Sequence, residues 1–146
     1  PRVGGSFRLL RILFRFVLPV GWAWFIFWVS SAPVPPGTGG SSFLDFLPRA
    51  DLFAHFAVYA IFAWLVMLAV LPIKLCKPIN VSLHFAMPVI IVGVFGIGME
   101  FVQDTIPERS AEALDVVADV LGAIATVAVM TYLWPKIKRL GYAIAA

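Results

Sequence analysis

Four long apolar runs, separated by short polar or proline-rich segments, constrain this chain more than any other feature. They cover about residues 9–29, 51–71, 81–101 and 113–133, and each matches the roughly 20 residues that a helix needs to cross a bilayer. Hydrophobic residues make up 62% of the 146 positions and charged residues only 13%, against about 45–50% and ~25% in soluble domains. The sequence therefore predicts an all-α integral membrane protein, a single domain over residues 1–146 with four transmembrane helices.

The positive charges lie at the ends of the apolar runs and predict how these runs cross the membrane. With a cytoplasmic N-terminus, nine of the 11 Lys and Arg residues lie inside, and only Arg49 and Arg109 lie outside. The positive-inside rule thus places both termini in the cytoplasm. Because the net charge of +3 comes from these flanking residues, we expect membrane lipids and no nucleic acid as partners.

Three polar side chains begin the second apolar run. Asp51, His55 and Tyr59 are spaced i, i+4 and i+8, so a helix places all three on one face, about one turn apart. Ionisable groups at this depth are costly unless they have a partner or a function. We therefore interpret this face as half of a polar site.

The later runs supply the other half. Glu100 and Gln103 end the third run, Arg109 lies in the following turn, and Asp115 and Asp119 share one face at the start of the fourth. The predicted topology brings all of these residues and the start of the second run to the extracytoplasmic side. The sequence therefore predicts a polar cluster at the extracytoplasmic ends of helices two to four.

Individual roles in this cluster remain open from sequence alone. Arg109 follows Pro107 on a constrained turn, where its guanidinium is suited to bind phosphate or carboxylate in a bidentate way, or to lock the helices by a salt bridge. Asp115 fits the positive end of the helix dipole. Asp119 lies one turn deeper and should be either protonated or paired, with Arg109 or His55 as the partner.

Metal binding and catalysis have weaker support. His55, Glu100, Asp115 and Asp119 form a plausible ligand set for a divalent metal, but their spacing matches no metal motif. A general-base role for His55, with an aspartate orienting it, is conceivable on the same residues. The sequence therefore predicts no metal, no other cofactor and no catalytic residue, and more readily indicates a binding protein than an enzyme.

The order and spacing of these residues resemble the VanZ-like family of small bacterial membrane proteins. The resemblance covers about residues 51–122, and two positions depart from it: Leu52 stands where the family usually has Lys, and Asp119 where it usually has Asn. The matching motifs are Asp51-x3-His55-Phe56-x2-Tyr59, Glu100-x2-Gln103 and Pro107-x-Arg109-x5-Asp115-x3-Asp119-x2-Gly122. The resemblance implies a multi-span helical protein of the cell envelope, in the bacterial inner (plasma) membrane. The founding member of the family is associated with teicoplanin resistance.

Two functions are therefore expected. In the first, the polar cluster binds a polar lipid headgroup, a cell-wall component or a glycopeptide-type ligand at the outer leaflet. In the second, the chain is a structural or accessory subunit of a larger membrane complex, and the cluster only clamps the helices. Co-purification of other chains at fixed stoichiometry would distinguish the second from the first.

Overall fold

The computed structural model describes residues 4–32, 50–70, 81–107 and 111–144. These residues form four helices, α1 (Gly4–Ser30), α2 (Ala50–Val70), α3 (Val81–Gln103) and α4 (Ala113–Ile144), and contain no strand. Each helix includes a segment long and apolar enough to cross a membrane. The prediction of an all-helical chain with four candidate spans is confirmed.

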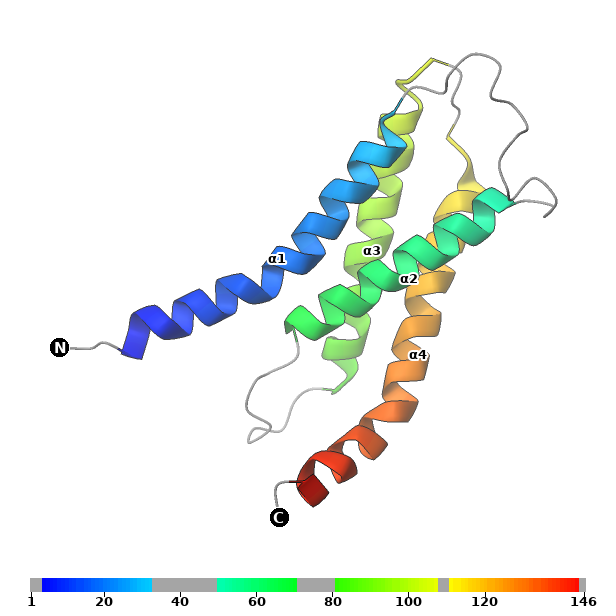
Figure 1. Cartoon of the computed structure of the whole chain (residues 1–146). Coiled ribbons are helices and arrows are strands. Elements are labelled where there is room, and N and C mark those ends of the chain that lie inside the picture. Colours follow the sequence, from blue (N-terminus) through cyan, green and yellow to red (C-terminus); the bar gives the residue numbers. More distant parts are fainter. Residues whose placement is uncertain (1–3, 33–49, 71–80, 108–110, 145–146) are drawn as a thin grey trace.

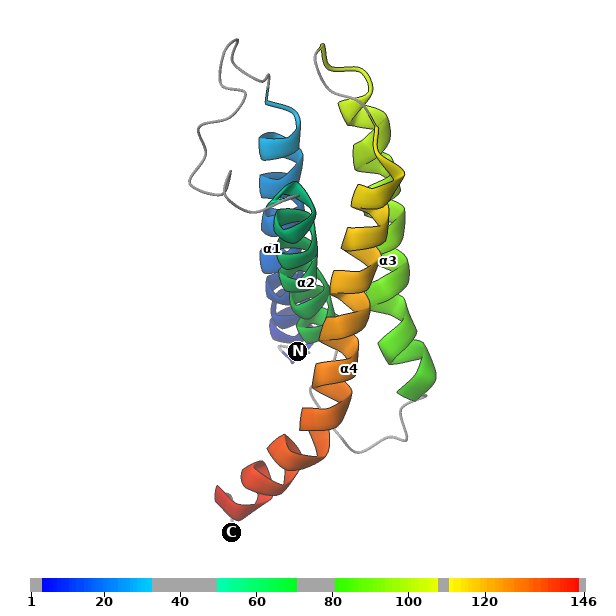
Figure 2. The same cartoon turned by 90° about the vertical axis from the view of Figure 1, so that its right-hand side faces the viewer.

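The helix boundaries agree with the apolar runs except at three ends. Helix α1 begins five residues before Leu9, and α3 continues two residues beyond Phe101. The fourth apolar run coincides with the candidate span Ala113–Leu133, but α4 continues past Pro135 to Ile144. Proline removes one backbone hydrogen bond, yet the strong helix formers that follow it sustain the helix, and Figure 2 shows the axis of α4 turning aside over its last turns.

Helix α2 lies at the centre of the bundle. It packs against α4 most extensively, and also against α3 and α1, while α3 packs on α4. The ends of α1 and α3 and the beginnings of α2 and α4 lie at the same end of the bundle (Figure 1). This arrangement brings polar residues from distant parts of the sequence to one end of the bundle.

Small residues allow α2, α3 and α4 to approach closely. A Cβ atom on Gly122 would overlap the backbone carbonyl of Phe56 in α2, and a Cβ atom on Gly93 would touch Val120 at 3.5 Å. Thr126 adds a hydrogen bond from its hydroxyl to the carbonyl of Ala60, at 2.9 Å. Glycine and threonine at such positions are the usual means by which membrane helices associate.

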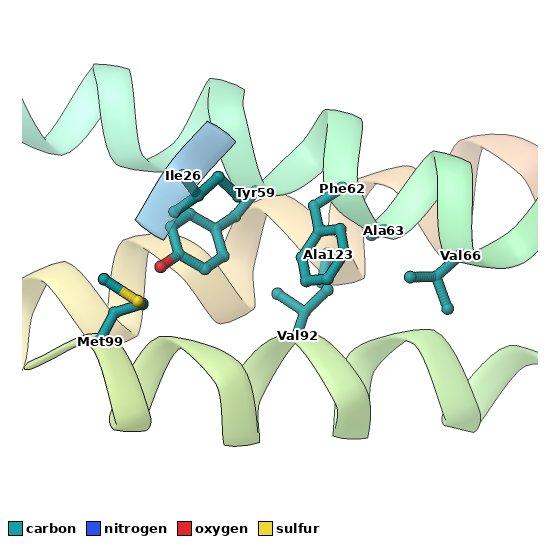
Figure 3. Close-up of a cluster of buried hydrophobic side chains, with 8 residues drawn as sticks. All are labelled: Ile26, Tyr59, Phe62, Ala63, Val66, Val92, Met99 and Ala123. Carbon is teal, nitrogen blue, oxygen red and sulfur yellow. The ribbon is translucent and has the colours of Figure 1, made fainter. Parts of the chain in front are cut away.

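The apolar core is small and is built mainly between α2, α3 and α4. Figure 3 shows its residues, with Tyr59 between Ile26 of α1 and Met99 of α3. Its buried members are Ile26, Tyr59, Phe62, Ala63, Val66, Val92, Met99 and Ala123. Many large hydrophobic side chains elsewhere on the helices, such as Phe14, Trp24 and Phe101, are exposed, as expected for helices whose solvent is lipid.

Helix α1 is the peripheral member of the bundle. Only 11% of its apolar segment is buried, against 28–33% in the other three helices. Trp22 attaches it to α2 by donating a hydrogen bond from Nε1 to the carbonyl of Val58, at 3.0 Å. Pro19 lies in the middle of α1, where Figure 1 shows the helix axis bending, because proline lacks the backbone donor of a regular helix.

Candidate functional site: a carboxylate and histidine cluster between three helices

The three polar residues of α2 lie on one side of the helix but in different surroundings. Asp51 is exposed, His55 is half-buried and Tyr59 is fully buried. The imidazole of His55 stacks on the ring of Tyr59, with ring centroids 6.0 Å apart and planes inclined by 7°. Tyr59 therefore belongs to the apolar core and supports the position of His55.

His55 contacts two aspartates of α4 with its two ring nitrogens. Nδ1 lies 3.0 Å from Oδ1 of Asp119, within hydrogen-bond distance. Nε2 lies 3.5 Å from Oδ2 of Asp115. The i, i+4 spacing of the aspartates on α4 lets one imidazole from α2 meet both carboxylates. Of the two partners considered for Asp119, the structure therefore provides His55.

Asp119 is enclosed between α2 and α3 because of a glycine in α3. A Cβ atom added to Gly96 would lie only 2.6 Å from Oδ2 of Asp119. Any larger residue at position 96 would displace the carboxylate that holds His55. The glycine-rich second half of α3 thus makes room for a polar group as well as for a neighbouring helix.

Glu100 connects α3 to the beginning of α4. Its Oε2 accepts a hydrogen bond from the backbone N–H of Glu112 at 2.8 Å, and Glu112 directly precedes the first residue of α4. The first N–H groups of a helix lack partners within the helix, so a carboxylate from another helix acts here as a cap. The side chain of Glu112 is exposed, as its sequence position suggests.

Of the two remaining predicted residues, the structure describes Gln103 but not Arg109. Gln103 is buried at the end of α3, next to Asp104, whose side chain is exposed. Arg109 lies outside the described residues. The structure thus brings together four of the predicted residues, which are His55, Glu100, Asp115 and Asp119. Three others lie nearby, and the structure describes no hydrogen bond or ion pair between them and the carboxylates of this group; they are Asp51, Tyr59 and Gln103.

Several carboxylate oxygens in the cluster are buried without a hydrogen bond to any residue that the structure describes. They are Oε1 of Glu100, Oδ1 of Asp115 and Oδ2 of Asp119. A buried polar atom with no partner is costly. Each of these oxygens can therefore still bind a proton, accept a hydrogen bond or coordinate a cation.

A cavity of about 360 Å³ adjoins the cluster on the side of α1. Its polar lining comes from Ser30, Asp51, His55, Tyr59 and Gln103, and its apolar lining from α1 and α2. Four of these five are residues that the sequence predicted for the site. Ser30 and the apolar residues Phe25, Ile26 and Val29 of α1 were missed, since no spacing within α1 indicates which face packs against α2.

The comparisons with known proteins add no further information about this site. No protein-family model, no curated protein and no solved structure matches the chain.

Proposed function

We propose that this chain is a multi-pass protein of the bacterial inner membrane, of the VanZ-like kind, that binds a polar headgroup or cell-wall-type ligand. The ligand would occupy the cavity between α1, α2 and α3, with both termini of the chain in the cytoplasm. The observation that carries the proposal is the cavity lining, in which apolar residues of α1 meet His55, Asp51 and Gln103. Ligand sites combine such apolar walls with a few polar groups that orient the ligand.

The polar residues suit a ligand with both donors and acceptors. Gln103 offers an amide that can donate and accept, and His55 offers an imidazole. Apolar walls from Phe25 and Val58 would cover an acyl chain. Arg109, six residues before Asp115 in the sequence, is our candidate for an anionic group of the ligand, because its guanidinium binds phosphate or carboxylate in a bidentate way.

Native mass spectrometry of the purified chain tests this proposal. Phosphatidylglycerol, phosphatidylethanolamine, a polyprenyl phosphate and teicoplanin would each be added to the wild type, to Gln103→Leu and to Arg109→Ala. We expect one probe to bind the wild type and to bind both variants at least about tenfold more weakly. Asp104→Asn, an exposed position beside Gln103, should bind like the wild type. Unchanged binding in folded Gln103→Leu and Arg109→Ala would refute the proposal.

A second function, as an accessory subunit of a larger membrane complex, is favoured by the surface of α1. This helix is little buried and exposes large aromatic side chains, including Trp24 at 67% and Trp28 at 66%. Such a surface can pack against another membrane protein as well as against lipid. Extraction in a mild detergent, followed by sizing and mass analysis, decides the question: other chains at fixed stoichiometry support it, and a chain that runs alone refutes it.

A further inference from the structure

The cluster contains more buried carboxylates than its imidazole can neutralise. Glu100, Asp115 and Asp119 are 7%, 8% and 0% exposed, and His55 is the basic side chain that contacts the two aspartates. Each of the three carboxylates also has one buried oxygen without a hydrogen bond to a described residue. Buried carboxylates are stable when they are paired or when they coordinate a metal.

The donor atoms of three residues lie close together. His55, Glu100 and Asp115 each offer one ligand atom, and these atoms all lie within 4.8 Å of one another. The 3.5 Å between Nε2 of His55 and Oδ2 of Asp115 is long for a hydrogen bond. It is close to the roughly 3.4 Å that separates two ligands bound tetrahedrally to zinc at about 2.0–2.1 Å each.

The surroundings of these residues hold the donors in place. When Nδ1 of His55 carries the proton, it donates to Asp119 at 3.0 Å, and Nε2 keeps its lone pair toward Asp115. A histidine that binds a metal commonly donates its other N–H to a carboxylate in this way. Glu100 is held through Oε2 by the backbone N–H of Glu112, which leaves Oε1 as its unpartnered oxygen.

From this geometry we propose that His55 Nε2, Glu100 and Asp115 bind one divalent transition-metal ion of the zinc or manganese class, and that Asp119 orients the imidazole. One imidazole with two carboxylates suits such ions better than calcium or magnesium, which prefer oxygen ligands alone. Three protein ligands leave a position for water or for another ligand. Only His55 is shared with the cavity lining, so this proposal does not depend on the headgroup proposal.

Metal content is the direct test. The chain, purified in detergent and stripped with a chelator, would be incubated with Zn²⁺, desalted and analysed by elemental mass spectrometry. We expect one zinc per wild-type chain, and binding weakened at least about tenfold in Glu100→Gln and Asp115→Asn. Asp119→Asn should weaken binding about 10–100-fold, the usual effect of removing an orienting partner.

Two matched controls separate this site from general binding to acidic side chains. Glu112 and Asp104 are exposed acids near the same helix ends, and Glu112 belongs to a second, mostly exposed acidic group with Asp51 and Asp115. Glu112→Gln keeps the backbone N–H that holds Glu100, so it should bind zinc like the wild type, as should Asp104→Asn. Loss of zinc in Glu112→Gln together with retention in Glu100→Gln would overturn the proposal.

Two further readouts keep the test decisive if a variant fails to fold. Zn²⁺ should raise the unfolding temperature of the wild type by mass action, whereas an equal concentration of Mg²⁺ should not. Co²⁺ bound in place of zinc should give a visible absorption spectrum, and this spectrum should shift in the Asp119→Asn variant. A wild type that retains no zinc after desalting and shows no zinc-dependent stabilisation would refute the site, whatever its behaviour toward lipids.

Discussion

Nδ1 of His55 lies 3.0 Å from Oδ1 of Asp119, although 64 positions separate the two residues in the sequence. The contact joins the first turns of α2 to those of α4 and closes the polar end of the bundle. A carboxylate at position 119 is a stronger acceptor for an imidazole N–H than an amide would be.

Substitutions at this pair should be coupled. We expect His55→Leu and Asp119→Leu each to lower the free energy of unfolding by on the order of 1–3 kcal/mol, because each leaves a polar partner buried. In the double variant, the free energy of unfolding should fall by less than the sum of the two single losses. The difference, which is the coupling energy, should be about 0.5–3 kcal/mol. Thermal or denaturant unfolding in detergent measures this cycle, and simple additivity would contradict a direct interaction.

Gly122 should be far less tolerant of a side chain than Gly98. A Cβ atom on Gly122 would overlap the backbone of α2 at Phe56, whereas one on Gly98 would have nothing within 4 Å. We expect Gly122→Ala to destabilise the protein by about 1–3 kcal/mol, as overpacking does. Gly98→Ala should be neutral or stabilising by up to about 1 kcal/mol, since alanine favours the helix; equal effects in the two unfolding measurements would argue against the α2–α4 packing.

Trp22 should attach α1 to the rest of the bundle. Trp22→Phe removes the donor to the carbonyl of Val58 and keeps most of the aromatic area, so we expect a loss of about 0.5–1.5 kcal/mol. Trp24→Phe, on the exposed side of the same helix, is the control and should leave the unfolding temperature unchanged. A Trp22→Phe variant as stable as the control would show that this hydrogen bond does not hold α1.

Thr126 should contribute through its hydrogen bond across helices. Thr126→Val keeps the shape of the side chain but removes the hydroxyl that donates to Ala60 at 2.9 Å, and we expect a loss of about 0.6 kcal/mol, the average for such bonds in membrane proteins. Thr131→Val is the matched control, because Thr131 is exposed and donates to Val127 in its own helix. Unfolding of both variants in the same detergent gives the comparison.

The proposed orientation can be tested with the single cysteine. Cys76 follows Lys74 in the connection between the second and third apolar runs, so the positive-inside rule places it in the cytoplasm. A membrane-impermeant maleimide should label it only after cells are permeabilised. In a Cys76→Ser background, Thr105→Cys, exposed just after α3, should be labelled in intact cells, and the reverse pattern would place the polar cluster on the cytoplasmic side.

The sequence predicted the helices well because their cause is local. A run of about 20 apolar residues must satisfy its own backbone hydrogen bonds in lipid, and a helix does so within one segment. For this reason the starts of α2, α3 and α4 lie within one residue of the predicted positions. Helix α4 continues beyond its predicted span, because a proline weakens a helix at one bond without forcing it to end.

The sequence also indicated which polar residues need partners, because a buried charge is costly wherever it lies. It left open whether Asp119 meets Arg109 or His55, and did not show that Glu100 caps α4 through the backbone of Glu112. Those pairings depend on how α2, α3 and α4 rotate and approach one another. Gly96 and Gly122 set that approach.

The sequence alone therefore determined four helices that are long and apolar enough to cross a membrane, and it identified polar residues that need partners. The tertiary structure decided which of them touch, that Tyr59 supports His55, and that α1 closes a cavity over this face. The physical reason is that hydrophobicity and charge act on each segment separately, whereas a hydrogen bond or a ligand site requires atoms from several helices to lie within a few ångströms of one another.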